Sequence, residues 1–262
     1  MLHDFDLITH AFPHEITIYP IADVHLGVVE HAESEWQAFL RRVEKEDAYL
    51  ILAGDMLNNS TRGTRFANPF DESLRPREAK RMMVEYLEPI KKRILCVVSG
   101  NHEQRTTRDS DQDLTYDICS KLDVEHLYRE NIAFMCVSVG QRNTEKKALS
   151  TYNFVVTHGG GGGIYTGAAV NRDERFCNVI EGADCIITGH VHKGFISKPA
   201  KIVIDARNRC VCQKHYVVVS CVSWLNYGGY AARAMLLPAQ VCDPQRLRLV
   251  ADKDRKKIIT TW

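Results

Sequence analysis

The chain has 262 residues, of which 45% are hydrophobic and 26% are charged, and its formal net charge is +1. This length and composition are typical of a folded globular protein with a sizeable core, and they predict a single domain over residues 1–262. The near-neutral charge excludes a global basic field that would recruit nucleic acid or a membrane, so any site for a polyanion must be local. The longest apolar runs, residues 48–54 and 216–222, are far too short to cross a bilayer.

The cysteines and the first residues both indicate a cytoplasmic protein. Nine cysteines are an odd number and cannot all pair, and several lie inside apolar runs, where free thiols behave as small hydrophobic groups. Residues 1–10 carry acids where a secretory signal would carry lysine or arginine. We interpret the C-x-C pair, Cys210 and Cys212, as ordinary strand or turn residues, because no second such pair lies nearby.

Short β-like runs alternate with helical patterns through the first two thirds of the chain. Helices are expected at residues 34–47, 76–92, 111–121 and 171–181. Strands are expected at residues 15–25, 48–55, 93–100, 132–139, 152–158, 184–188, 201–205, 215–222, 245–250 and 256–261. The alternation predicts an α/β layered fold, and the later strands, with few helices between them, predict a second sheet packed on the first. In this interpretation residues 15–195 form the core, 56–75 are a candidate cap or insert, and 200–262 complete the second sheet.

Five of the expected strands end in the same way, with polar side chains directly after an apolar run. The endings are Asp23-Val24-His25, Gly54-Asp55 with Asn58, Gly100-Asn101-His102-Glu103, Thr157-His158-Gly159, and Gly189-His190-Val191-His192. Active sites of open α/β sheets lie outside the carboxyl ends of the strands, so these endings can converge on one crevice. Aspartate, histidine and asparagine without cysteine suit divalent metals such as Mn, Fe, Co, Ni or Zn. Seven of these side chains are too many ligands for one tetrahedral zinc. They suit two metals about 3.5–4 Å apart.

The motifs ADVHLG, GDMLN, GNHE, THGG and GHVH occur in this order over about residues 21–192. In this set the chain resembles the calcineurin-like metallophosphoesterases. The resemblance implies a four-layer α/β/β/α sandwich of two packed mixed β-sheets flanked by helices. It also implies hydrolysis of phosphate esters by a hydroxide that bridges two divalent metals, with Mn expected and Fe, Zn, Ni, Co or Mg as alternatives.

The same resemblance implies a role for each motif residue. The first metal would be held by Asp23, His25 and His192, the second by Asn101, His158 and His190, and Asp55 would bridge them. His102 would stabilise the transition state or protonate the leaving oxygen. We expect His102 and Asp55 to be the catalytic residues. Candidates for holding the substrate phosphate are Asn101, Arg105, Arg62 and Arg65.

The resemblance specifies the reaction type better than the substrate. We favour a phosphodiesterase acting on nucleotides or nucleic acid, because arginines near GNHE could hold an extra phosphate. The near-neutral charge and the absence of an aromatic-basic stripe count against a nuclease. A phosphomonoesterase acting on phosphoprotein or small phosphate esters stays open, as does a non-catalytic binding protein that keeps the fold.

Five consecutive glycines, Gly159 to Gly163, follow His158. No Gly-Lys-Ser/Thr follows them, so they are not a P-loop, and their position inside a domain counts against a linker. A backbone without side chains can approach the metals and leave room for a phosphate. One glycine would serve that purpose, so the sequence leaves open whether the others form a mobile lip over the substrate or a tight turn.

Overall fold

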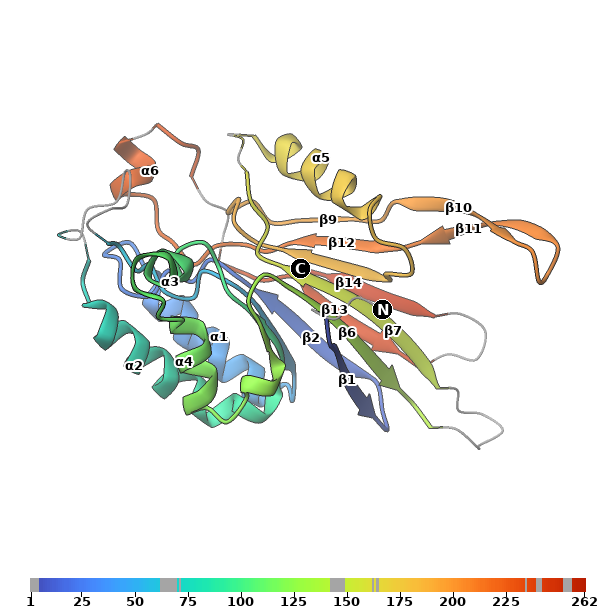
Figure 1. Cartoon of the computed structure of the whole chain (residues 1–262), viewed down its shortest axis with the longest axis horizontal. Helices are drawn as coiled ribbons and strands as arrows, with labels where there is room; N and C mark the ends of the chain where they lie inside the picture. Colours follow the sequence, from blue (N-terminus) through green and yellow to red (C-terminus); the bar gives the residue numbers. More distant parts are fainter. Residues whose placement is uncertain are drawn as a thin grey trace.

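Two six-stranded mixed β-sheets lie face to face at the centre of the protein (Figure 1). The computed structural model describes residues 5–61, 70, 72–141, 149–161, 163, 165–233, 235–238, 242–251 and 256–262. In the first sheet, called the β3 sheet, the order of strands is β14 (Lys257–Thr261), β13 (Arg246–Val250), β2 (Ile16–Ile21), β3 (Tyr49–Ala53), β4 (Ile94–Val98) and β5 (Tyr128–Arg129). In the second, called the β7 sheet, the order is β1 (Leu7–Phe12), β6 (Ile132–Val139), β7 (Ser150–Thr157), β8 (Cys185–Thr188), β12 (Val217–Ser220) and β9 (Phe195–Ser197).

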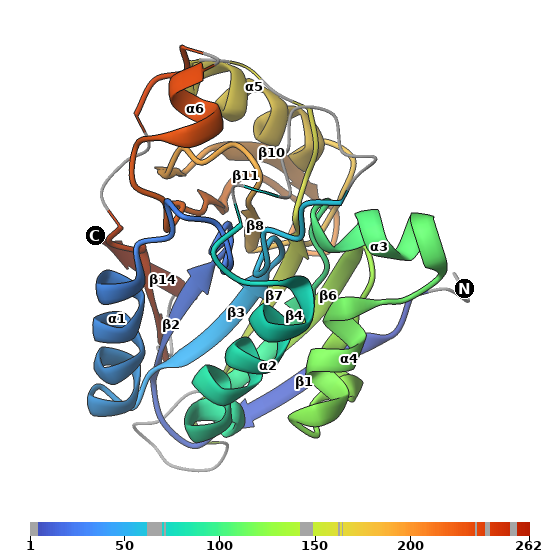
Figure 2. The ribbon, with the colours of Figure 1, turned by 90° about the vertical axis from the view of Figure 1, so that its left-hand side faces the viewer.

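Helices cover the outer face of each sheet. On the β3 sheet these are α1 (Glu33–Lys45), α2 (Pro76–Leu87) and α4 (Leu114–Lys121), as Figure 2 shows. On the β7 sheet it is α5 (Thr166–Cys177) (Figure 1). The remaining helical segments are η2 (Glu88–Arg93), α3 (Glu103–Ser110), η3 (Glu125–Leu127) and α6 (Gly229–Arg233). The four layers that the resemblance implies are therefore confirmed.

The burial of apolar side chains explains this layering. Helix α1 buries Trp36, Phe39 and Val43, which the spacing of apolar residues assigns to one helix face. The main core fills the space between the sheets and beneath α1, α2 and α4, and all five residues of β4 are buried in it. A smaller core lies between α5 and the β7 sheet and contains Ala169, Cys177 and Val218. Two packed sheets with both faces covered explain why β3, β4 and β8 are continuous apolar runs rather than alternating ones.

Several elements differ from the expectation. Strand β1 was not predicted, because only one of its six residues is buried and its sequence LITHAF lacks a long apolar run. Helix α3 was not predicted either, because its sequence EQRTTRDS has no apolar periodicity and only Glu103 is buried. The expected helix at 76–92 ends as an α-helix at Leu87 and continues as η2.

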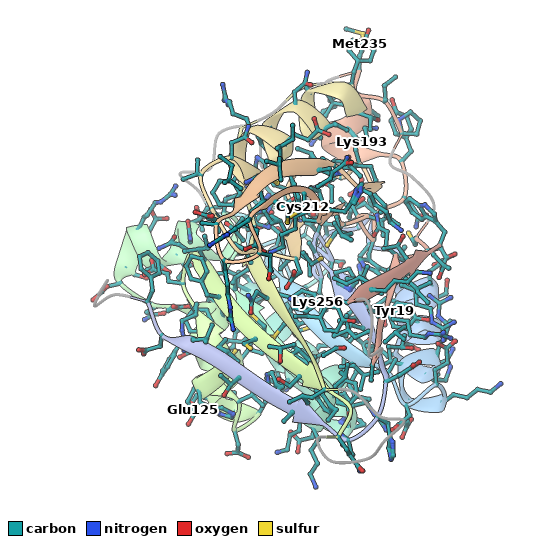
Figure 3. The ribbon with its side chains drawn as sticks, turned by 90° about the vertical axis from the view of Figure 1, so that its right-hand side faces the viewer. Tyr19, Glu125, Lys193, Cys212, Met235 and Lys256 are labelled. Carbon is teal, nitrogen blue, oxygen red and sulfur yellow. The ribbon has the colours of Figure 1, made fainter. Side chains whose placement is uncertain are left out.

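The C-terminal part also departs from the prediction that residues 200–262 complete the second sheet. Strand β12 joins the β7 sheet, whereas β13 and β14 extend the β3 sheet. Strands β10 (Ala200–Asp205) and β11 (Cys210–His215) belong to neither sheet and pair only with each other. This hairpin projects from the body in Figure 1 and toward the viewer in Figure 3, where its exposed Cys212 is labelled. Its side chains are too exposed to supply core to either sheet.

All nine cysteines are free, and Cys210 and Cys212 are strand residues, as expected. Among the described residues, no helix combines the length and the apolar character needed to cross a membrane. Residues 62–69 and 71 of the candidate cap 56–75 lie outside the described residues, so that assignment stays a prediction.

Candidate metal centre

The polar side chains that follow five strands come together where the two sheets meet. Strands β2, β3 and β4 are parallel neighbours in the β3 sheet, and β7 and β8 are parallel neighbours in the β7 sheet. Because parallel strands end at the same edge, the loops after them are adjacent. Hydrogen bonds lock these loops together: Asp23 N donates to Gly54 O at 3.0 Å, and His190 N donates to the Asp23 carboxylate at 2.9 Å.

Five of the seven expected ligands have a left-handed backbone. Their φ angles are 55° at Asp23, 51° at His25, 51° at Asp55, 75° at His190 and 54° at His192. Aspartate and histidine tolerate this conformation better than most residues, but it still costs energy outside glycine. The surrounding loops hold it in place, since His25 N donates to Asp55 O at 3.0 Å. Such concentrated strain is characteristic of functional sites, where side chains are aimed at a common point.

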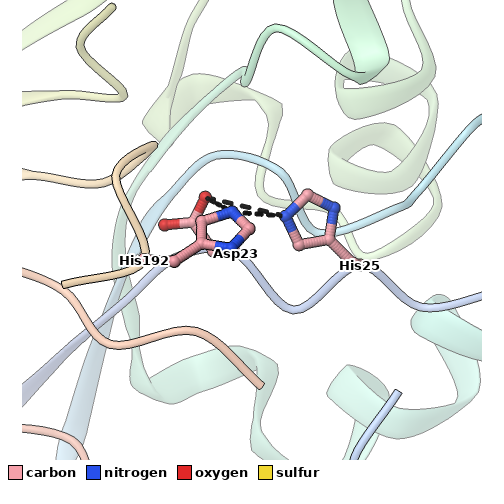
Figure 4. Close-up of side chains that lie close together, drawn as sticks. All are labelled: Asp23, His25 and His192. Carbon is pink, nitrogen blue, oxygen red and sulfur yellow. Dashed lines mark hydrogen bonds and ion pairs between the residues drawn. The ribbon is translucent and has the colours of Figure 1, made fainter. Parts of the chain in front are cut away.

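The first cluster consists of Asp23, His25 and His192 (Figure 4). The Nε2 atom of His192 lies 3.3 Å from Asp23 Oδ1, and the Nε2 atom of His25 lies 3.7 Å from the same oxygen. The two Nε2 atoms are 3.0 Å apart. The three side chains thus converge on one point, and both Asp23 and His25 are buried.

The second cluster contains Asp55, His158, His190 and Asn101. His158 Nδ1 donates to the main-chain oxygen of Ala53 at 2.8 Å, which directs its Nε2 into the site. That Nε2 lies 3.0 Å from Asn101 Oδ1 and 3.2 Å from Asp55 Oδ2. His190 Nδ1 lies 2.7 Å from the same Asn101 oxygen. A carbonyl partner that fixes the tautomer of a histidine is the usual support of a metal ligand.

Asp55 lies between the two clusters. Its Oδ2 atom is 3.2 Å from Nε2 of His158 and 3.9 Å from Nε2 of His25, so one carboxylate faces a histidine of each cluster. Its Oδ1 atom accepts the main-chain N–H of His102 at 2.8 Å. The carboxylate is buried and oriented by the next motif along the chain.

The charges of the site favour cations at its centre. The pKa of Asp55 lies below its ordinary value, because His102, His158 and His25 outweigh the effect of burial. Burial opposes protonation of His158, yet Asp55 and Asp23 raise its pKa to about 10. His192 likewise has a raised pKa, because Asp23 outweighs burial. The carboxylates that hold protons on the neighbouring imidazoles create a negative potential. The same potential would attract a divalent cation to the site.

His102 faces the site from the start of α3. Its Nδ1 donates to the main-chain oxygen of Asn58 at 2.6 Å, and its Nε2 lies 3.7 Å from Asp55 Oδ2. Burial, together with His25 and Arg105, lowers its pKa to about 3. Arg105 donates to the same Asn58 oxygen at 3.2 Å, which places its guanidinium beside His102. The Asn58 side chain instead donates to Glu72 at 2.7 Å, so Asn58 supports the site through its main chain.

Two charged residues of the site were not singled out from the sequence. Glu103 is buried and accepts main-chain N–H groups from Leu57 at 2.7 Å, Gly100 at 3.0 Å and Asp55 at 3.1 Å. Burial, with Asp55, raises its pKa to about 7. Arg172 of α5 reaches the loops that carry His158 and His190. The GNHE motif contains Glu103, but only the fold shows that it ties three loop amides together. Arg62 and Arg65 lie outside the described residues.

The donor set fits divalent metals. Three groups of His and Asp place one ligand atom each within 4.8 Å of one another: Asp23, His25 and His192; His25, Asp55 and His102; Asp55, His158 and His190. Buried carboxylates and imidazoles with orienting hydrogen bonds are the ligands that Mn, Fe, Co, Ni and Zn accept. Sharing of Asp55 and His25 between these groups is consistent with a binuclear site.

Residues 16–194 match the family model described as calcineurin-like phosphoesterase. No curated protein matches the sequence significantly. Among solved structures, the chain is similar to Yfce, a phosphoesterase from E. coli, with 14% identity, a TM-score of 0.44, and coverage of 94% of this chain and 98% of that one. It is also similar to GAP50, the anchor in the inner membrane complex of Plasmodium, with 9% identity, a TM-score of 0.47, and coverage of 95% and 88%. A cold-active protein-tyrosine phosphatase of a psychrophilic Shewanella has 11% identity, a TM-score of 0.34, and coverage of 98% and 80%.

Proposed function

The chain belongs to the calcineurin-like phosphoesterase family and is a metal-dependent phosphoesterase, and from this premise we propose a binuclear site in which Asp55 is shared. The observation that carries this proposal is the position of the Asp55 carboxylate between His158 and His25. The first metal would be held by Asp23, His25 and His192, and the second by Asn101, His158 and His190. Mn is the metal we expect, since oxygen and imidazole donors are mixed and no thiolate lies in the set.

Two bound cations would supply an activated water and would neutralise charge on the phosphoryl oxygens. The residues of the chain then bind, orient and protonate. His102 holds its Nδ1 proton on the Asn58 carbonyl, so its Nε2 is the atom that faces the substrate. Its lowered pKa means that it carries no proton on Nε2 at rest, and the negative charge of an incoming phosphodiester would favour one. We assign His102 to stabilising the transition state and protonating the leaving oxygen, which contributes about 10²–10⁴-fold.

We propose that the substrate is a phosphodiester of a nucleotide or nucleic acid. Arg105 supports this proposal, because its guanidinium donates to the same Asn58 oxygen as His102, and we expect it to contact a phosphate oxygen of the substrate. Asn101 is placed among the ligands, where it would contact both metal and substrate. Arg62 and Arg65 remain candidates from the sequence for the same role. The free cysteines fit a reducing compartment, so we place the protein in the cytoplasm.

An assay with a diester and the corresponding monoester distinguishes a phosphodiesterase from a phosphomonoesterase. Purified protein with added Mn²⁺ is assayed on bis-p-nitrophenyl phosphate and on p-nitrophenyl phosphate, and we expect the larger kcat/KM on the diester. A larger value on the monoester would reverse the assignment to a phosphomonoesterase. If neither ester is hydrolysed with any divalent metal, the catalytic hypothesis fails. The alternative of a non-catalytic binding protein that keeps the fold would then be supported.

The shared carboxylate is tested by Asp55→Asn. An amide cannot bridge two cations through two anionic oxygens, so we expect the variant to bind fewer than two metals per chain and to lose activity. Asp117→Asn is the matched control, because Asp117 pairs with Lys80 on the surface and should leave metal content unchanged. Two tightly bound metals in Asp55→Asn, measured by elemental analysis after dialysis, would contradict the bridging role.

A further inference from the structure

The side chain of Arg172, in helix α5, extends to the two loops that carry ligands of the second metal. Its Nη1 donates to Gly160 O at 3.4 Å, and its Nη2 donates to Gly189 O and to Thr188 Oγ1, both also at 3.4 Å. Gly160 lies two residues after His158, and Gly189 directly precedes His190. The guanidinium therefore lies next to the loops that carry His158 and His190, and it acts on the charge of His190.

One end of this guanidinium is fixed and the other is loosely held. Nε donates to Asp173 Oδ1 at 2.6 Å, and buried Asp173 also accepts the Thr188 hydroxyl at 2.7 Å. The three contacts of the Nη atoms, by contrast, are at the long limit of a hydrogen bond. A guanidinium has five N–H donors, and these contacts supply four acceptors among the described residues. One donor is therefore available for a further acceptor. The side chain is 20% exposed, so a ligand in solution can reach it.

The first two glycines of the run, Gly159 and Gly160, lie against this guanidinium. Gly159 has φ +85°, and a Cβ added there would lie 3.4 Å from Cζ and from Nη2 of Arg172. Gly161 has φ +77°, whereas a Cβ at Gly160 or Gly161 would meet nothing within 4 Å. The main-chain N–H groups of Gly160 and Gly161 meet no acceptor among the described residues. When successive residues alternate between right-handed and left-handed backbone conformations, their N–H groups can point toward one anion.

We propose that Arg172 and the main chain of Gly159–Gly161 form an anion subsite that binds a second phosphate group of the substrate. This proposal rests on the proposed function, since the first phosphate is the one that reacts at the metals. The chemistry is that of a phosphate one linkage away from the scissile one, as in a diphosphate or along a nucleic acid strand. The planar fork of arginine suits two oxygens of one phosphate, and loose Nη contacts are readily exchanged for it. The subsite also accounts for glycines beyond the one that follows the ligand His158.

The first test measures binding and does not depend on turnover. Isothermal titration of the metal-loaded protein is carried out with thymidine 5′-monophosphate, thymidine 5′-diphosphate and thymidine 3′,5′-bisphosphate. We expect at least one two-phosphate ligand to bind more tightly than the monophosphate, and Arg172→Ala to weaken that ligand by about tenfold to a hundredfold. A preference for the diphosphate indicates a pyrophosphate-linked substrate, and a preference for the bisphosphate indicates a nucleic acid strand. Equal affinity of wild type for all three ligands overturns the subsite.

The second test compares variants in catalysis. For Arg172→Ala we expect a loss of kcat/KM on a two-phosphate diester that exceeds the loss on bis-p-nitrophenyl phosphate by about tenfold or more. Arg175→Ala, an exposed arginine on the same helix, is the matched control and should alter neither. Arg172→Lys keeps the charge without the fork and should show an intermediate loss, which serves if the alanine variant does not fold.

Equal losses on both substrates, with a changed metal content, would mean that Arg172 only supports the loops, and this would overturn the subsite. No loss on either substrate would overturn it as well. If wild type hydrolyses neither substrate while the titration shows the expected preference, the proposed function fails and the subsite stands.

Discussion

Replacing Gly100 by alanine inserts a methyl group where the ends of β3 and β4 approach each other most closely. A Cβ at Gly100 would lie 2.1 Å from the main-chain nitrogen of Asp55 and 2.1 Å from its Oδ1. Gly54 faces it, since a Cβ there would lie 2.8 Å from Gly100 Cα. The glycines that open the GD and GN motifs therefore let two ligand-bearing loops touch through their backbones.

The size of the effect follows from these distances. Ordinary van der Waals contact of a Cβ begins near 3.4 Å, so Asp55 would have to move by more than about 1 Å to accept a methyl group. Overpacking of this kind costs about 1–3 kcal/mol and sometimes more, which corresponds to a decrease in Tm of roughly 2–12 °C. A displacement of about 1 Å in a catalytic group can lower kcat about 10²-fold. Asp55 is the proposed shared ligand, so we expect the loss of metal to be at least as marked as the loss of stability.

The assay compares Gly100→Ala with Gly167→Ala. Gly167 is the second residue of α5, and a Cβ there would meet nothing within 4 Å, so its replacement should leave activity unchanged and stabilise the protein by about 0.4–1 kcal/mol. Differential scanning calorimetry gives Tm, elemental analysis gives metal content, and bis-p-nitrophenyl phosphate gives kcat. A Gly100→Ala protein with wild-type Tm and two bound metals would refute the close approach of these loops.

Three further predictions concern protons and the acid. His102→Ala should lower kcat by about 10²–10⁴-fold with metal content preserved, and unchanged kcat would exclude His102 from catalysis. The pKa of His158 is raised to about 10 in the metal-free protein, so metal binding at pH 7 should release its proton and the affinity for metal should rise with pH. Calorimetric titrations of metal in buffers of different ionisation enthalpy detect the released proton. Metal binding without proton release would contradict this prediction. The pKa of Glu103 is raised from 4.5 to about 7, so the folded metal-free protein retains a proton that the unfolded chain has lost, and stability should fall from pH 4.5 to 7. Glu103→Gln should remove that part of the slope in urea unfolding, and an identical slope in both proteins would show that Glu103 does not titrate there.

The positions of the expected ligands could be predicted because strand endings are local features of a sequence. An apolar run followed by Asp-x-His or Gly-Asn-His specifies both a buried strand and a polar group at its carboxyl end. Parallel strands then bring these ends to one edge, and the structure does bring Asp23, Asp55 and His158 together. The layering was predictable for a similar reason, since β3 and β4 are continuous apolar runs with amphipathic helices around them.

Other features depend on contacts between residues far apart in the chain. Glu103 belongs to the GNHE motif, but its role arises only because the loop after β3 presents the amides of Asp55 and Leu57 to it. Arg172 lies on a helix whose sequence gives no sign that one arginine extends to a glycine loop. The hairpin of β10 and β11 was assigned to a sheet because strand propensity does not reveal the partner of a strand.

The central claim is that two metals share Asp55 between the endings of the two sheets. Crystals grown with Mn²⁺ and measured at a wavelength where manganese scatters anomalously would locate the ions directly. We predict two anomalous peaks about 3.5–4 Å apart on either side of the Asp55 carboxylate, one beside His25 and His192 and the other beside His158 and His190. A single peak, or peaks away from Asp55, would contradict the account.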